Sequence, residues 1–127
     1  MEFKIDTREK FTTITLLNEI LSDNITGLLD EKCREILAGD IKNVILNFAK
    51  IQEMDLPNAQ KLIELRMLFF EQNASFVICE LQKEIQQFLD QNDLLETLNI
   101  TPTESEAWDI VQMEEIEREY LDDDFPG

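Results

Sequence analysis

The spacing of apolar residues along this chain alternates between the patterns of strands and of helices. Residues 44–48 (VILNF) and 76–81 (FVICEL) are apolar at nearly every position, which is typical of strands buried on both faces of a parallel sheet. Between them, residues 57–73 carry apolar side chains at helical spacing. A strand, a crossover helix and a parallel strand form a βαβ unit, which is nearly always right-handed.

The pattern before this unit predicts a β-hairpin and a helix. Residues 3–6 alternate between apolar and polar, and residues 12–17 are rich in β-branched side chains, so we expect two strands with a turn near residues 8–10. Apolar residues then recur every three or four positions between Ser22, a good N-cap, and Gly39, a good helix stop. This segment is predicted to be an amphipathic helix facing the sheet.

The pattern after the unit predicts two more helices and an edge strand. Residues 82–91 read as a short helix, and residues 97–100 as a short edge strand. Thr101 or Thr103 caps a last helix, and Thr103 with Glu106 has the spacing of a capping box. Its apolar side is predicted to consist of Trp108, Val111, Ile116 and Tyr120.

The element order β-β-α-β-α-β-α-β-α predicts an α/β fold with a mixed β-sheet and about four helices packed mainly on one face. A length of 127 residues suits one domain. We assign residues 1–120 to this domain and expect residues 121–127 to form an acidic, frayed tail. The sequence has no linker between domains and no run of 18 apolar residues, so we expect no membrane insertion.

The charge narrows the range of partners. The chain carries a formal net charge of −17, which disfavours nucleic acids and anionic membranes because both require basic residues. The last 27 residues hold ten acidic residues and a single basic one, Arg118. This excess is either a solvated helix face or an electrostatic attraction for a basic partner surface.

Catalysis is not expected. The chain contains no histidine, which excludes Ser-His-Asp and Cys-His triads and zinc sites that use histidine. Cys33 and Cys79 are far apart in sequence and are predicted to be reduced thiols in or near the core of a cytoplasmic protein. We find no phosphate-binding loop, no EF-hand and no polar constellation for a small ligand, so we expect no metal and no cofactor.

Residues 43–55 (NVILNFAKIQEMD) and the LPNAQ that follows indicate a buried strand, a loop, an acidic residue and a helix start. Together with FVICEL and the Phe88-Leu89-Asp90 segment, they resemble the STAS domain family of anti-sigma factor antagonists. The resemblance implies a phosphorylation switch. In that family a kinase modifies a serine in an Asp-Ser-Ser/Thr-Gly turn, and the unmodified domain docks on an anti-sigma factor.

This chain departs from the family turn. Asp55 matches the family Asp, but Leu56 and Pro57 stand where Ser and Ser/Thr are expected, and Asn58 stands in place of Gly. Leu and Pro have no hydroxyl group, and no Ser, Thr or Tyr occurs between Thr26 and Ser75. We therefore predict that this turn is not phosphorylated.

We expect a non-enzymatic docking module whose partner is an anti-sigma factor or a serine-kinase-like regulatory protein. The alternative is a structural or accessory STAS subunit of a larger regulatory or transporter assembly, and a homo-oligomer remains open. Asp55 is interpreted as a helix N-cap that can also belong to the docking surface. Leu56 lies either in the core or on that surface. The predicted partner-binding residues are Met54, Asp55, Leu56, Pro57 and Asn58.

A second apolar feature lies later in the same helix. Met67, Leu68, Phe69 and Phe70 together cover every side of a helix, so at least one must point away from the sheet unless another element covers it. Core packing and a dimer or partner patch are the two interpretations.

Overall fold

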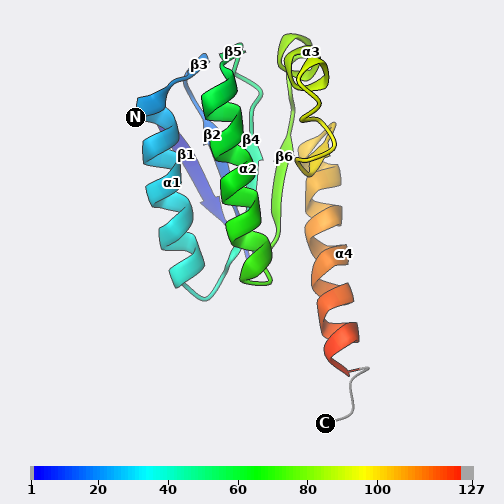
Figure 1. Cartoon of the computed structure of the whole chain (residues 1–127). Helices are drawn as coiled ribbons and strands as arrows, with labels where there is room; N and C mark the ends of the chain where they lie inside the picture. Colours follow the sequence, from blue (N-terminus) through cyan, green and yellow to red (C-terminus); the bar gives the residue numbers. More distant parts are fainter. Residues whose placement is uncertain (1, 124–127) are drawn as a thin grey trace.

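The computed structural model describes residues 2–123, with side chains as far as Tyr120 (Figure 1). It contains seven strands and four helices in the order that the sequence predicts, with two short strands added. The elements are β1 (Phe3–Thr7), β2 (Phe11–Leu16), β3 (Ile20–Leu21), α1 (Asp23–Ala38), β4 (Asn43–Asn47), β5 (Glu53–Met54), α2 (Leu56–Glu71), β6 (Phe76–Cys79), α3 (Lys83–Gln91), β7 (Ile100–Thr101) and α4 (Glu104–Asp123).

The main sheet has five strands in the order β1-β2-β4-β6-β7. β1 pairs antiparallel with β2, and every other pair in this sheet is parallel. The predicted βαβ unit is confirmed, because β4 and β6 are parallel neighbours joined by α2. A separate parallel pair, β3 and β5, lies at the end of the sheet where α1 and α2 begin (Figure 1).

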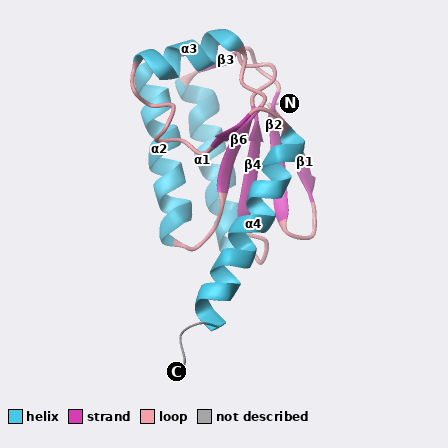
Figure 2. Cartoon of the chain, turned by 90° about the vertical axis from the view of Figure 1, so that its right-hand side faces the viewer, coloured by secondary structure: helices cyan, strands magenta, loops and turns pink. Residues whose placement is uncertain are grey.

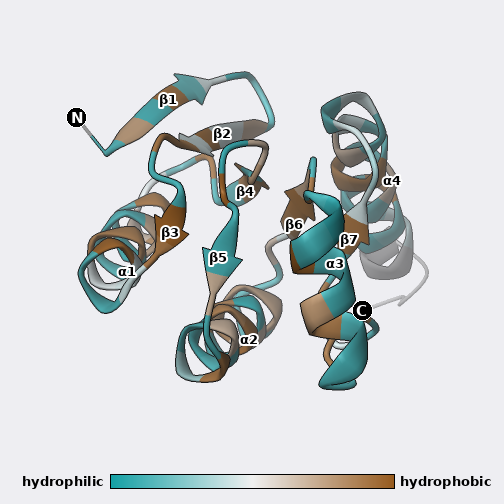
Figure 3. Cartoon of the chain, turned by 90° about the horizontal axis from the view of Figure 1, so that it is seen from above, coloured by the Kyte–Doolittle hydropathy of each residue, from teal (hydrophilic) through white to brown (hydrophobic). Residues whose placement is uncertain are grey.

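Two apolar clusters lie on opposite faces of this sheet. The larger one joins α1, α2 and α3 to one face, and the smaller one joins α4 to the other. Figure 3 shows α4 across the sheet from α1 and α2. Neighbouring residues of β4 contribute to different clusters, since Val44 and Leu46 belong to the larger cluster and Ile45 belongs to the smaller one. The predicted mixed sheet with helices mainly on one face is confirmed.

The predicted helix caps are present. The Ser22 hydroxyl accepts a hydrogen bond from the Ile25 backbone N–H at 3.3 Å, and the Thr103 hydroxyl accepts one from the Glu106 N–H at 3.2 Å. Gly39 ends α1 by donating its N–H to the Ile36 carbonyl. These bonds satisfy backbone groups that a helix end leaves unpaired.

The structure corrects the prediction near the last strand. Residues 97–100 were expected to be a strand, but only Ile100–Thr101 pairs with β6. The Thr97 and Leu98 N–H groups both donate to the Leu94 carbonyl instead. Burial of Leu98 favours this tight turn, because it turns that side chain into the larger core.

The predicted apolar side of α4 is also wrong in part. Val111 is buried, whereas Ile116 and Tyr120 are exposed. The physical reason is helical geometry, because at about 100° per residue Ile116 and Tyr120 lie on the side of α4 that faces away from buried Val111 and the sheet. The helix also continues past the end of the sheet (Figure 2). Of the predicted tail, residues 122 and 123 belong to α4 and residues 124–127 lie outside the described residues.

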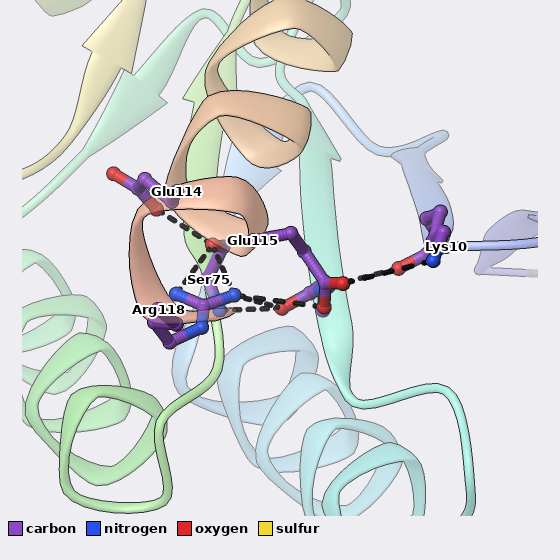
Figure 4. A network of polar contacts seen from close by, with 6 residues as sticks. Lys10, Ser75, Glu114, Glu115 and Arg118 are labelled. Carbon is purple, nitrogen blue, oxygen red and sulfur yellow. Dashed lines mark hydrogen bonds and ion pairs between the residues drawn. The ribbon is translucent and has the colours of Figure 1, made fainter. Parts of the chain in front are cut away.

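Polar side chains attach α4 to the amino ends of β4 and β6 (Figure 4). Buried Asn43 donates to the Glu115 carboxylate at 2.8 Å, and buried Ser75 donates its hydroxyl to Glu114 at 2.6 Å. The Arg118 guanidinium donates to the Asn43 side-chain oxygen at 3.2 Å and to the Ser75 hydroxyl at 3.3 Å. We call these five residues the α4 anchor.

Both cysteines are free and buried, as predicted. Burial raises the pKa of the Cys33 thiol to about 12, helped by nearby Asp30. Burial, with Glu104 and Glu80 nearby, raises the pKa of Cys79 to about 12. A thiol that stays protonated at neutral pH is a poor nucleophile.

These shifts predict a loss of stability in alkali. The unfolded chain releases its thiol protons near the ordinary pKa of 9.0, whereas the folded chain keeps them to about 12. The unfolded state therefore binds fewer protons across that window, and the free energy of unfolding falls as the pH rises through it. From pH 8 to pH 10 we expect a loss of roughly 1 kcal/mol per thiol.

Urea unfolding at the two pH values measures this loss. The Cys33→Ala/Cys79→Ala double variant is the control, because every other titrating group remains in it. An equal pH dependence in the wild type and the double variant would contradict the account.

Candidate functional site

The candidate site is the turn between β5 and α2, residues 54–58, which we call the docking turn. It lies at the edge of the molecule where the parallel strands end and where α1 and α2 both begin (Figure 1). The pairing of β3 with β5 sets Leu21 opposite Met54. The starts of the two helices are thereby held side by side.

Asp55 is the N-cap of α2. Its carboxylate accepts the Asn58 backbone N–H at 3.0 Å, and its extended backbone leads directly into the helix. Pro57 stands in the first turn, where a missing N–H costs nothing. The interpretation of Asp55 as a cap is therefore confirmed, and its carboxylate is also exposed to solvent.

Asn58 connects the two helix starts. Its side chain is buried, and its amide donates to the Asp55 carboxylate at 2.8 Å and to the Asp23 carboxylate of α1 at 3.0 Å. Each bond is charge-assisted and therefore stronger than a neutral one. Asn58, predicted as a contact residue, instead lies beneath the surface and fixes the two carboxylates above it.

The remaining residues of the docking turn divide by exposure. Met54 is half-buried and packs against the larger core, whereas Pro57 is exposed. Leu56 is 39% exposed, and Ile20, in the strand paired with β5, is 51% exposed. The question of where Leu56 lies is thus answered, since it presents apolar surface to solvent.

The fold also brings a hydroxyl group to this site. β3 ends at Leu21 and β5 ends at Met54, so Ser22 and Asp55 are the residues that directly follow these two paired strands. Both line one shallow depression on the surface. The sequence around Asp55 does not indicate Ser22, because 33 positions separate the two residues. The shared signal is that each is the N-cap of a helix that follows a strand.

The chemistry of the site is that of a binding surface. Glu53, Asp55 and Asp23 make it acidic, and Leu56 with Ile20 adds apolar contact area. Among the side chains that the structure describes, residues 2–120, no three from His, Cys, Asp or Glu gather as metal ligands. No helix in the same residues is long and apolar enough to span a membrane.

This combination of a mixed sheet, three helices on one face and an exposed turn before α2 defines a small α/β domain of the STAS type. Residues 2–107 match the model of the STAS domain family. The chain therefore belongs to the STAS domain family. No curated protein matches the sequence significantly.

Solved structures show the same fold. An anti-sigma factor antagonist from Mycobacterium paratuberculosis superposes with a TM-score of 0.73 at 9% identity, over 87% of this chain and 92% of that one. The Bacillus cell fate determinant SpoIIAA in its phosphorylated form gives a TM-score of 0.63 at 17% identity, over 86% and 98% of the two chains. The murine anion transporter Slc26a9 gives 0.63 at 11% identity, over 82% of this chain and 18% of the transporter.

Two substitutions test the roles of Asp55 and Asn58 at this site. Asp55→Asn keeps a good N-cap and removes the carboxylate charge, so we expect a small change in stability. Asn58→Ala removes the amide's bond to Asp55 and its bond across to Asp23 of α1, and it leaves both carboxylates without this donor. Chemical denaturation should show a loss of roughly 1–3 kcal/mol for Asn58→Ala. Equal stability of Asn58→Ala and wild type would show that the buried amide does not hold the site.

Proposed function

We propose that this chain is a non-enzymatic regulatory module that docks on another protein through the exposed residues of the docking turn. Asp55, Leu56 and Pro57 would make the contacts, and Met54 and Asn58 would support them from below. The observation that carries this proposal is an exposed leucine on a turn whose shape is fixed by a buried, charge-assisted hydrogen-bond network. A rigid surface loses little conformational entropy on binding.

The partner class follows from the family and the site together. The fold is shared with anti-sigma factor antagonists, so we propose an anti-sigma factor or a serine-kinase-like regulatory protein, met in the cytoplasm. Acidic residues around an apolar centre favour a partner with basic residues around an apolar pocket. The partner surface would accept the Leu56 side chain in that pocket.

Regulation would not use a hydroxyl group within the docking turn, because Leu56 and Pro57 have none. Docking in the unmodified state would therefore be constitutive with respect to this turn. Ser22 is the hydroxyl that the fold places beside Asp55, and its oxygen already accepts the α1 cap bond.

The proposal predicts that Leu56→Asp abolishes partner capture. A charged side chain cannot enter an apolar pocket without losing its hydration, whereas it remains hydrated on the free protein. Tagged wild-type and variant proteins are used as baits in lysate of the source organism, and captured proteins are identified by mass spectrometry. Met67→Asp is the matched control, because Met67 is an exposed apolar residue of the same helix, far from its start.

The expected result is that Leu56→Asp loses one anti-sigma-like or kinase-like protein and that Met67→Asp retains it. Capture of the same proteins by all three baits would contradict docking through the turn. Assembly or transporter subunits captured equally by all baits would favour the alternative of a fixed accessory subunit. Light scattering of the purified chain would then give its oligomeric state.

A further inference from the structure

Helix α4 has two different apolar sides. One side packs on the sheet through Ala107 and Val111, both fully buried. The other carries Met113, Ile116 and Tyr120, which are 55%, 62% and 68% exposed. At about 100° per residue these three lie within about 60° of one another and nearly opposite Val111. We call them the α4 stripe.

The α4 stripe has the spacing of a helix-pairing seam. Its residues stand at i, i+3 and i+7, the positions that meet a second helix in a coiled coil. This helix projects beyond the sheet (Figure 2), so the stripe is open to another molecule. All three residues also follow residue 107, where the match to the family ends. The stripe therefore lies outside the part of the chain that the family match covers.

Acidic residues border the α4 stripe. Glu106, Asp109 and Glu117 are exposed and lie on the same side of the helix. The single basic residue of α4, Arg118, is turned toward the sheet by its bonds to Asn43 and Ser75. The exposed side of α4 thus combines an apolar line with acidic side chains that form no ion pair among the described residues.

The negative charge of the border decides which kind of partner can bind the apolar stripe. A second copy would bring a stripe with the same acidic border, and like charges at close range oppose pairing. An anionic membrane is disfavoured for the same reason. A helix with lysine and arginine beside its own apolar seam would bury the stripe and neutralise its border.

The α4 anchor prepares this surface. Its hydrogen bonds hold the helix on the sheet at Asn43 and Ser75. Their partners in the helix, Glu115 and Glu114, lie within one turn of the stripe. These hydrogen bonds therefore hold in place the part of α4 from which its projecting half extends. A preformed helix surface binds with a smaller entropic cost than one that must fold on contact.

We infer that the α4 stripe is a second protein-binding surface, whose partner is a basic amphipathic helix of another protein. It is independent of the docking turn, which lies at the opposite end of the molecule (Figure 1). The chain can then join two binding events, one through each end.

Three helical peptides test this inference. All share one leucine seam, which is flanked by Lys and Arg in the first, Gln in the second and Glu in the third. Calorimetric titration of the full chain should rank their affinities in that order, and the affinity of the basic peptide should fall as salt is raised. Equal affinities, no binding of the basic peptide, or no effect of salt would overturn the inference.

Ile116→Gln locates the binding without changing the charge. We expect it to weaken the binding of the basic peptide by about tenfold, whereas Met67→Gln should change the affinity less than about twofold. Met67 is the matched control because it is 58% exposed and lies on α2, outside the pocket in which Phe70 meets Glu117 of α4. The Leu56→Asp variant should bind the peptide like wild type. A negative result for the α4 stripe can therefore be distinguished from a negative result for the docking turn.

Sedimentation of the chain alone tests the competing occupant. A monomer supports the inference. A dimer that Ile116→Gln converts to monomers would assign the stripe to a second copy and overturn it.

Discussion

The burial of β4 and β6 on both faces is the constraint on which the rest of the structure depends. Each strand has apolar side chains on both sides, so helices must cover the sheet from both directions. α1, α2 and α3 cover one face, and α4 alone covers the other. A single helix needs only Ala107, Val111 and their neighbours for this task, which leaves its projecting half free.

The same parallel arrangement creates the docking turn. Parallel strands end at one edge of the sheet, and the helices that follow them start there. The carboxylates at the two helix starts would repel each other without a donor between them, and the buried Asn58 amide supplies that donor to Asp23 and Asp55. The exposed Leu56 is therefore displayed on a fixed surface, in a turn that contains no residue with a hydroxyl group.

Much of this could be predicted from the sequence, because it depends on local patterns. The runs VILNF and FVIC, the caps Ser22 and Asp55 and the proline in the first turn of α2 each identify an element by themselves. The two-residue strands β3 and β5 have no periodicity to detect. The connection through Asn58 joins residues 35 positions apart. Ile116 is apolar but lies about 140° around α4 from buried Val111, so its exposure depends on which side of the helix packs on the sheet.

The central claim is that the unmodified docking turn is itself the contact surface. The most direct measurement is amide hydrogen exchange of the unphosphorylated chain, alone and with the protein that it captures. The account predicts partner-dependent protection at residues 53–58 and at neighbouring Ile20, with residues 67–71 unchanged. Protection confined to other segments, or complex formation only after phosphorylation of the chain, would contradict it.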